Sequence, residues 1–174
     1  MRDMSLRHAL LGLLVEHPAS GYDLLKTFDT SLANVWPATQ SQLYGELAKL
    51  ADSGLIVVSE QGPRGRKEYT LTGPGLAELR RWLTETEPQR TRSDVLLRVF
   101  FLGVLTPEQA RDYLDGQATQ AAGLHAELKK LDDAINWDDA DLSVYGRIAL
   151  EYGQRLAAMQ QEWAEWARTQ VKPG

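Results

Sequence analysis

Cysteine is absent from the 174 residues, and histidine occurs only three times. The lack of cysteine excludes a disulfide scaffold, a zinc–thiolate centre and a thiol nucleophile. The three histidines have no metal-ligand spacing, and the sequence contains neither a glycine-rich phosphate loop nor a nucleophile elbow. The sequence therefore predicts a protein that is not an enzyme and has no metal site and no cofactor.

Long hydrophobic runs are also lacking. The most apolar run, VLLRVFFLGVL at residues 95–105, contains Arg98 and has about half the length that a bilayer requires. We read it as a buried helix. A shorter run, HALLGLLV at residues 8–15, is not followed by a small-residue cleavage site, which argues against a signal peptide. We expect a cytoplasmic protein without a membrane partner.

An excess of positive charge is missing as well, since 19 Lys and Arg stand against 24 Asp and Glu, for a net charge of −5. Both halves of the chain are acidic, so general affinity for nucleic acid is not expected. The exception is local. Arg64, Arg66 and Lys67 lie together in the turn-rich stretch GPRGRK, between two short β-branched segments.

Periodicity predicts five elements in the N-terminal half. A helix capped by Ser5 runs to about Glu16, and a second covers residues 21–28. The third, QSQLYGELAKLADSG, starts after Thr39 and is closed by Gly54. LIVVSEQ and KEYTLT form a hairpin, and a helix follows from Pro74. In this reading Tyr22 belongs to the core or its edge, and His8 is an ordinary helix residue.

The C-terminal half shows two apolar seams with alternating steps of four and three. The first begins at Ala110 and ends at Ile135, and the second begins at Leu142 and ends at Trp166. Asp138, Asp139 and Asp141 lie between them and lack the spacing of a calcium loop, so we read them as a solvated connector. Such seams are typical of coiled-coil packing, here an antiparallel hairpin that can also pair with a second subunit.

The predicted fold is thus mainly α with a small β-hairpin. It comprises a winged helix-turn-helix DNA-binding domain at residues 1–87 and a coiled-coil-like helical dimerisation domain at residues 88–174. In such folds the third helix enters the major groove of double-stranded DNA, and the hairpin touches the flanking backbone or the minor groove. The predicted DNA contacts are Gln40, Ser41, Gln42, Tyr44 and Lys49 from the helix and Arg64, Arg66 and Lys67 from the wing.

Each of these groups has a plainer interpretation. The wing cations can be a solvated turn, the three polar residues at 40–42 can be an ordinary first helical turn, and Tyr44 can pack between helix and wing. For dimerisation we select Leu114, Leu124, Leu128, Tyr152, Leu156 and Trp163. The aromatic and sulfur-containing side chains Trp36, Met159, Trp163 and Trp166 are candidates for binding a small hydrophobic effector, or else they are packing residues.

The chain resembles the PadR family of bacterial transcriptional regulators. The resemblance rests on an ordered set of motifs along nearly the whole chain: Gly21-Tyr22-Asp23-Leu24, Trp36, Leu43-Tyr44, Leu47, Leu50, Gly54-Leu55-Ile56, Arg66-Lys67, Tyr69, Thr72, Gly75, and then residues 93–110 and 145–167. Gly45 and Glu46 in the third helix depart from the expected pattern, and Gly45 could let the backbone approach DNA closely.

The resemblance implies a homodimer that binds an inverted-repeat operator. It also implies repression of a neighbouring gene and release from DNA when a hydrophobic or phenolic effector binds. Two alternatives remain at this point: a dimeric winged-helix module for protein contacts, and a module that binds hydrophobic ligands without binding DNA.

Overall fold

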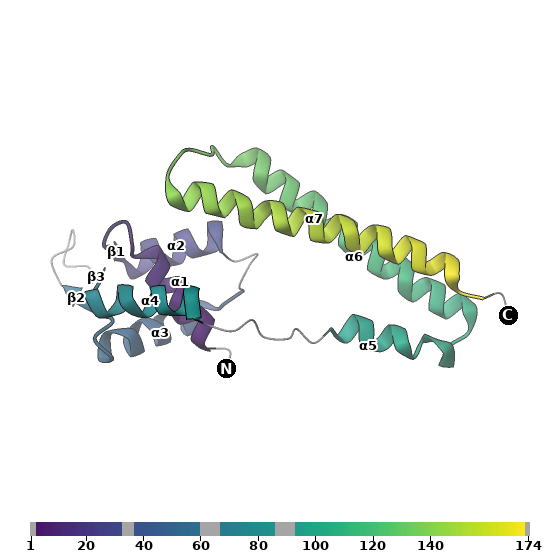
Figure 1. The fold of residues 1–174 in the computed structure, drawn as a ribbon, viewed down its shortest axis with the longest axis horizontal. Helices are drawn as coiled ribbons and strands as arrows, with labels where there is room; N and C mark the ends of the chain where they lie inside the picture. Colours follow the sequence, from purple (N-terminus) through teal and green to yellow (C-terminus); the bar gives the residue numbers. More distant parts are fainter. Residues whose placement is uncertain (1–2, 33–36, 60–66, 86–92, 173–174) are drawn as a thin grey trace. The chain divides into compact units, whose positions relative to one another are not determined.

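The computed structural model describes residues 3–32, 37–59, 67–85 and 93–172, which form two compact units divided between residues 89 and 90 (Figure 1). The described elements of the first unit follow the order expected of a winged helix-turn-helix. They are α1 (Asp3–Leu13), β1 (Ala19–Ser20), α2 (Gly21–Ser31), α3 (Gln40–Asp52), β2 (Ile56–Ser59), β3 (Glu68–Leu71) and α4 (Gly73–Glu85). The predicted fold class is confirmed. At α1 the predicted ends were wrong, because Ser5 lies inside the helix and the helix ends at Leu13.

The predicted hairpin is present as strands β2 and β3, which pair antiparallel from Ile56–Leu71 to Ser59–Glu68. A third strand, β1, pairs with the other edge of β3, where Ala19 lies opposite Tyr69. The sequence pattern did not predict β1, because a two-residue strand is too short to show alternation. The small sheet fixes the base of the wing and joins it to the start of α2.

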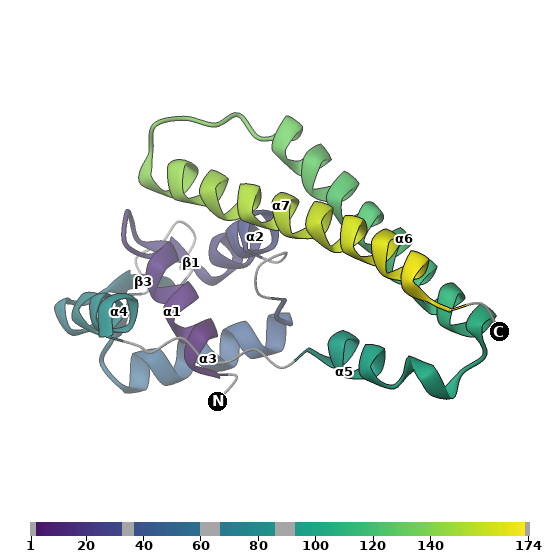
Figure 2. The same ribbon diagram turned by 45° about the vertical axis from the view of Figure 1, so that its right-hand side comes forward.

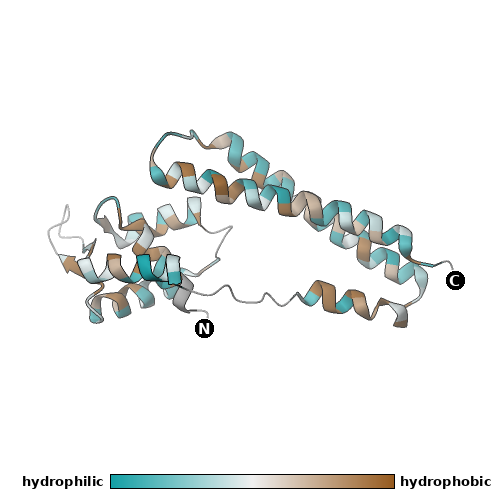
Figure 3. Cartoon of the chain, viewed as in Figure 1, coloured by the Kyte–Doolittle hydropathy of each residue, from teal (hydrophilic) through white to brown (hydrophobic). Residues whose placement is uncertain are grey.

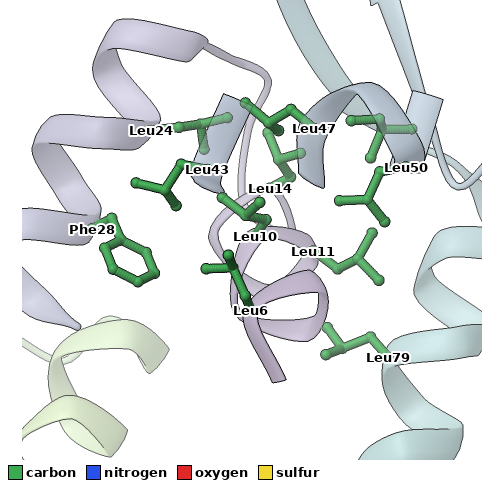
Figure 4. Close-up of a cluster of buried hydrophobic side chains, with 11 residues drawn as sticks. Leu6, Leu10, Leu11, Leu14, Leu24, Phe28, Leu43, Leu47, Leu50 and Leu79 are labelled. Carbon is green, nitrogen blue, oxygen red and sulfur yellow. The ribbon is translucent and has the colours of Figure 1, made fainter. Parts of the chain in front are cut away.

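The core of the first unit forms where α1, α2, α3 and α4 meet (Figure 4). Leu10 and Leu11 of α1 and Phe28 of α2 are fully buried. From α3 come the three leucines predicted for its core face: Leu43, Leu47 and Leu50. Large side chains of this kind each stabilise a fold by about 2 kcal/mol when buried. The opposite side of α3 is thereby fixed toward solvent.

The start of α4 is held against the beginning of the hairpin. The Thr72 hydroxyl donates to the Leu55 carbonyl oxygen at 2.8 Å and accepts from the Gly75 amide at 3.1 Å. Gly75 is buried there, and a Cβ atom at this position would lie 2.0 Å from the Leu55 carbonyl oxygen. Glycine at this position therefore allows helix and strand to approach closely.

His8 has a more specific environment than the ordinary helix position expected for it. The ring is buried and stacks on Trp82 of α4, with centroids 4.6 Å apart and planes 6° from parallel. Its Nε2 lies 3.2 Å from Glu78 Oε1, while the other Glu78 oxygen pairs with Arg81. The hydrogen bond from Arg81 and, more weakly, that from His8 lower the pKa of Glu78, while burial opposes the shift. The cluster joins α1 to α4.

The second unit contains α5 (Asp94–Phe100), the 3₁₀ turn η2 (Leu102–Val104), α6 (Pro107–Ala134) and α7 (Asp141–Gln170). The two long helices lie side by side in opposite directions, as both ribbon views show (Figures 1 and 2). A capping box between Thr106 and Gln109 starts α6, and Pro107 occupies its first turn. The predicted antiparallel hairpin is present.

The buried seam of the hairpin repeats every seven residues on both helices. It consists of Leu114, Ala121 and Leu128 on α6 and Leu150, Ala157 and Ala164 on α7. On α7 the predicted seam was wrong, because Tyr145, Tyr152, Met159 and Trp166 are exposed. The buried seam of α7 contains the small residues Ala157 and Ala164, which permit close contact between the two helices. A Cβ on Gly153 would lie 3.1 Å from Leu128 Cδ1.

The connector between α6 and α7 is fixed by Asp132. Its carboxylate accepts from the Trp137 indole at 2.8 Å and from the Gln154 amide at 3.2 Å. Asp138 accepts from the Ala140 amide, and Asp141 is the first residue of α7. This agrees with the solvated connector expected there. Within the described ranges we find no cluster of three potential metal ligands and no helix suited to crossing a membrane.

Candidate nucleic-acid interface

Helix α3 is the centre of the predicted interface, and its first turn is fixed by a capping box. The Thr39 hydroxyl accepts from the Gln42 amide at 3.3 Å, and the Gln42 side-chain oxygen accepts from the Thr39 amide at 2.8 Å. Gln42 is exposed, but its carbonyl oxygen is already used by the cap. Gln40 and Ser41, also exposed, have no such role among the described contacts.

The side of α3 opposite the core carries Ser41, Gly45, Ala48 and Asp52, which are all exposed and spaced by three and four residues. Around Gly45 a Cβ would find no atom within 4 Å. The outward stripe is therefore made of short side chains around the helix centre, so a large partner can reach the backbone. Gln40 and Tyr44 flank it.

Tyr44 connects three elements of the first unit. Its ring covers Gly21 at the start of α2, where an added Cβ would lie 2.7 Å from Tyr44 Cε1. It also lies near Tyr69 of β3, whose pKa is raised by burial and by the neighbouring Tyr44. Tyr44 is nevertheless 40% exposed, so the side chain both packs and presents surface to solvent. The two roles considered for Tyr44, contact with DNA and packing between helix and wing, are therefore compatible.

Lys49 and Glu46 form an ion pair on α3, and Glu46 links the pair to α1. The Lys49 Nζ is 3.1 Å from Glu46 Oε2, and the Arg7 Nε of α1 is 3.5 Å from Glu46 Oε1. Glu46 is only 4% exposed although it is charged. The sequence indicated Glu46 as a departure from the family pattern but did not indicate this burial.

Of the wing cations, Lys67 is exposed next to β3. Arg64 and Arg66 lie outside the described residues. Tyr22 was expected in or near the core with its hydroxyl reaching backbone or phosphate, and its side chain is 64% exposed in the first turn of α2.

The second unit exposes a large apolar surface. Every residue of α5 is exposed or half-buried, and Phe100 and Val104 are 85% and 84% exposed. Figure 3 shows α5 as largely hydrophobic along its length. The prediction of a buried helix at residues 95–105 was therefore wrong for the single chain. Soluble proteins rarely leave such a surface uncovered.

The predicted dimerisation residues divide into two groups. Leu114 and Leu128 are buried against α7 of the same chain, so their side chains are already covered without a second subunit. Leu124 and Tyr152 are exposed, and Leu156 and Trp163 are half-buried. Among the effector candidates, Met159 and Trp166 are exposed on α7 next to Trp163, and Trp36 lies outside the described residues.

Two family models match the chain. One is described as the transcriptional regulator PadR-like family and matches residues 10–81. The other is described as the virulence activator alpha C-terminal domain and matches residues 91–172. The boundary between the two matches falls in the same region of the chain as the boundary between the two compact units.

The chain is similar to the negative transcriptional regulator PadR of Bacillus subtilis. It is 37% identical over 129 residues, which cover 71% of each chain. Its crystal structure with operator DNA has a TM-score of 0.79 at 28% identity and covers 97% of this chain and 99% of the other. Its complex with p-coumaric acid has a TM-score of 0.83 at 26% identity, covering 99% and 98%. The chain belongs to the PadR-like family of transcriptional regulators, which are not enzymes.

Proposed function

We propose that this regulator is a homodimeric repressor that binds an inverted-repeat operator and is released by a small aromatic effector. The observation that carries DNA binding is α3, which presents exposed Gln40, Ser41 and Tyr44 above a buried leucine face. The solved complex of the Bacillus subtilis relative with operator DNA supports the same activity here. A repressor of this kind acts at the chromosome in the cytoplasm.

Recognition is divided between bases and phosphates. Gln40 has the amide that can read adenine, and Ser41 can contact either base or backbone. Lys67, together with Arg64 and Arg66 from the same stretch, supplies charge for phosphates. Tyr22 and Tyr44 add hydroxyl groups near the start of α2. Gln42 contributes chiefly through the first turn of α3, because its oxygen holds the capping box.

The proposed subunit interface uses the apolar surface of the second unit. Tyr145, Tyr152, Met159 and Trp166 are exposed at steps of seven along α7, and this heptad repeat is the pattern by which two helices from different subunits pack. The exposed residues of α5 offer a second apolar surface in the same unit. A two-fold dimer would place its two α3 helices about 34 Å apart, one turn of DNA.

Operator binding is tested by titrating the full chain onto its own upstream DNA and onto a scrambled duplex of equal length. We expect operator affinity in the nanomolar range that falls steeply between low and moderate salt, since phosphate contacts release counterions. Replacing Lys67, Arg64 or Arg66 by Ala should weaken binding to both duplexes equally and reduce the salt slope by about one per lost contact.

Gln40→Ala should behave differently and relax preference at one base position, with a loss of about 1–3 kcal/mol there. Leu83→Ala, a change at an exposed residue of α4, is a matched control. Equal binding of operator and scrambled duplex by the unaltered chain would contradict the proposal and favour a protein-contact or ligand-binding module.

Effector binding is expected at the aromatic side chains of α7, because planar ligands favour flat apolar surfaces. We predict that p-coumaric acid quenches tryptophan fluorescence and lowers operator affinity. Trp163→Phe and Trp166→Phe should diminish the quenching, while Trp137→Phe, at the connector, should leave the effector's action on DNA unchanged. Quenching that persists in the Trp163 and Trp166 variants would place the effector elsewhere. An effector can shift DNA binding only by its differential affinity for the two states.

A further inference from the structure

A buried carboxylate lies in the helix that we assign to DNA reading. Glu46 is 4% exposed and belongs to the same buried side of α3 as Leu43, Leu47 and Leu50. A buried charge is unfavourable unless it is paired with opposite charge. In a leucine-rich core position an apolar residue would satisfy packing alone, so the carboxylate must act through its charged partners.

Two cations contact this carboxylate, one from each side. Lys49 Nζ lies 3.1 Å from Oε2, and this lysine is 59% exposed along its side chain. Arg7 Nε lies 3.5 Å from Oε1, is itself buried, and makes no hydrogen bond within the described part of the chain. Glu46 is therefore an ion-pair partner of two cations, of which the Lys49 side chain is 59% exposed and the Arg7 side chain 28% exposed.

The pairing changes how these cations can act toward DNA. Lysine and arginine contacts to phosphates supply affinity that does not depend on sequence, whereas base contacts supply discrimination. Lys49 lies one turn beyond Gly45, on the helix that carries the exposed reading side chains. An unpaired cation there would increase binding to every duplex. Its pairing with a buried carboxylate limits that contribution.

We propose that Glu46 is a specificity-determining residue, whose buried carboxylate holds Lys49 and Arg7 in an ion-paired cluster and thereby restricts the sequence-independent phosphate affinity of α3. The inference rests on the DNA-binding function proposed above. The buried Glu46 carboxylate partly neutralises Lys49 and Arg7, and this lowers the effective positive charge beside α3.

The test is Glu46→Gln in the full chain, a change that preserves size and removes the charge. We expect affinity for a scrambled duplex to rise about threefold to tenfold at low salt, and the salt slope to steepen by about 0.9 for each new phosphate contact. Operator affinity should rise less, so the ratio of operator to scrambled affinity falls. A residue needed only for packing would instead weaken binding to both duplexes.

Two further variants identify the source of the change. In Glu46→Gln combined with Lys49→Ala, most of the gain on scrambled DNA should disappear. Asp52→Asn removes another acid from the exposed side of the same helix, and any gain that it causes should persist when Lys49 is replaced. Unchanged or weaker scrambled binding by Glu46→Gln, or a gain that does not depend on Lys49, overturns the proposal.

Two different results separate the role of Glu46 from the repressor function. If the unaltered chain binds operator no better than scrambled DNA, the repressor function is contradicted, whereas the response of the scrambled-duplex salt slope still tests Glu46. If the unaltered chain prefers its operator and Glu46→Gln leaves both slope and preference unchanged, only the role of Glu46 is lost.

Discussion

Gly75→Ala is expected to destabilise the first unit by about 3 kcal/mol. The new Cβ would lie 2.0 Å from the Leu55 carbonyl oxygen and 2.8 Å from Leu71 Cδ1. The first of these is a backbone atom, so a rotamer change cannot relieve the contact. Helix α4 would have to move from β2, and the hydrogen bonds of Thr72 to Leu55 and Gly75 would be lost with it.

The matched control is two residues away. At Gly73, also in α4, an added Cβ has no atom within 4 Å, so Gly73→Ala should be neutral or stabilising by up to about 1 kcal/mol. Urea unfolding of the full chain, followed by circular dichroism, gives the midpoint for each variant. Equal midpoints for the two variants would show that the approach of α4 to β2 is not the constraint.

The double variant Phe100→Asp and Val104→Asp should convert the proposed dimer to a monomer. Both side chains are more than four-fifths exposed in the single chain, so the variant should keep its helical content. An unpaired charge buried in an interface costs several kcal/mol, so two such charges should raise the dimer dissociation constant at least about 100-fold. Sedimentation velocity over a concentration series measures this.

Operator affinity should fall in parallel, because a monomer occupies one half-site. Leu83→Asp places one such negative charge at an exposed apolar residue of α4, in the first unit, and should leave the subunit assembly intact. A double variant that sediments as the unaltered chain does would remove α5 and η2 from the interface. The exposed heptad repeat of α7 would then be the surface to alter next, beginning with Tyr152.

The sequence predicted those parts of the fold that depend on local signals. The Thr39 cap, the left-handed Gly54 at φ 71° and the leucine spacing defined α3 correctly, because each is a short-range effect. The wing strands were predicted for the same reason. Strand β1 was missed, since it exists only through its pairing with β3.

Predictions that depend on which side of a helix is covered were less successful. On α7 large residues at steps of four and three formed the more conspicuous seam, yet the hairpin packs through Leu150, Ala157 and Ala164. Hydrophobicity alone favours the aromatic side, whereas close helix packing favours small side chains. The burial of Glu46 and of His8 was not predicted, because burial of a charged or polar side chain depends on partners distant in sequence.

The exposure of α5 has a consequence for gene control. If this surface is covered only when two chains meet, the amount of DNA-binding species at low expression depends on the square of the subunit concentration. Operator occupancy would then respond to synthesis of the protein more steeply than for a repressor that is active as a monomer. A given fall in production would then release the gene to a larger extent, and the seven-residue helix α5 would help to set the concentration at which repression begins.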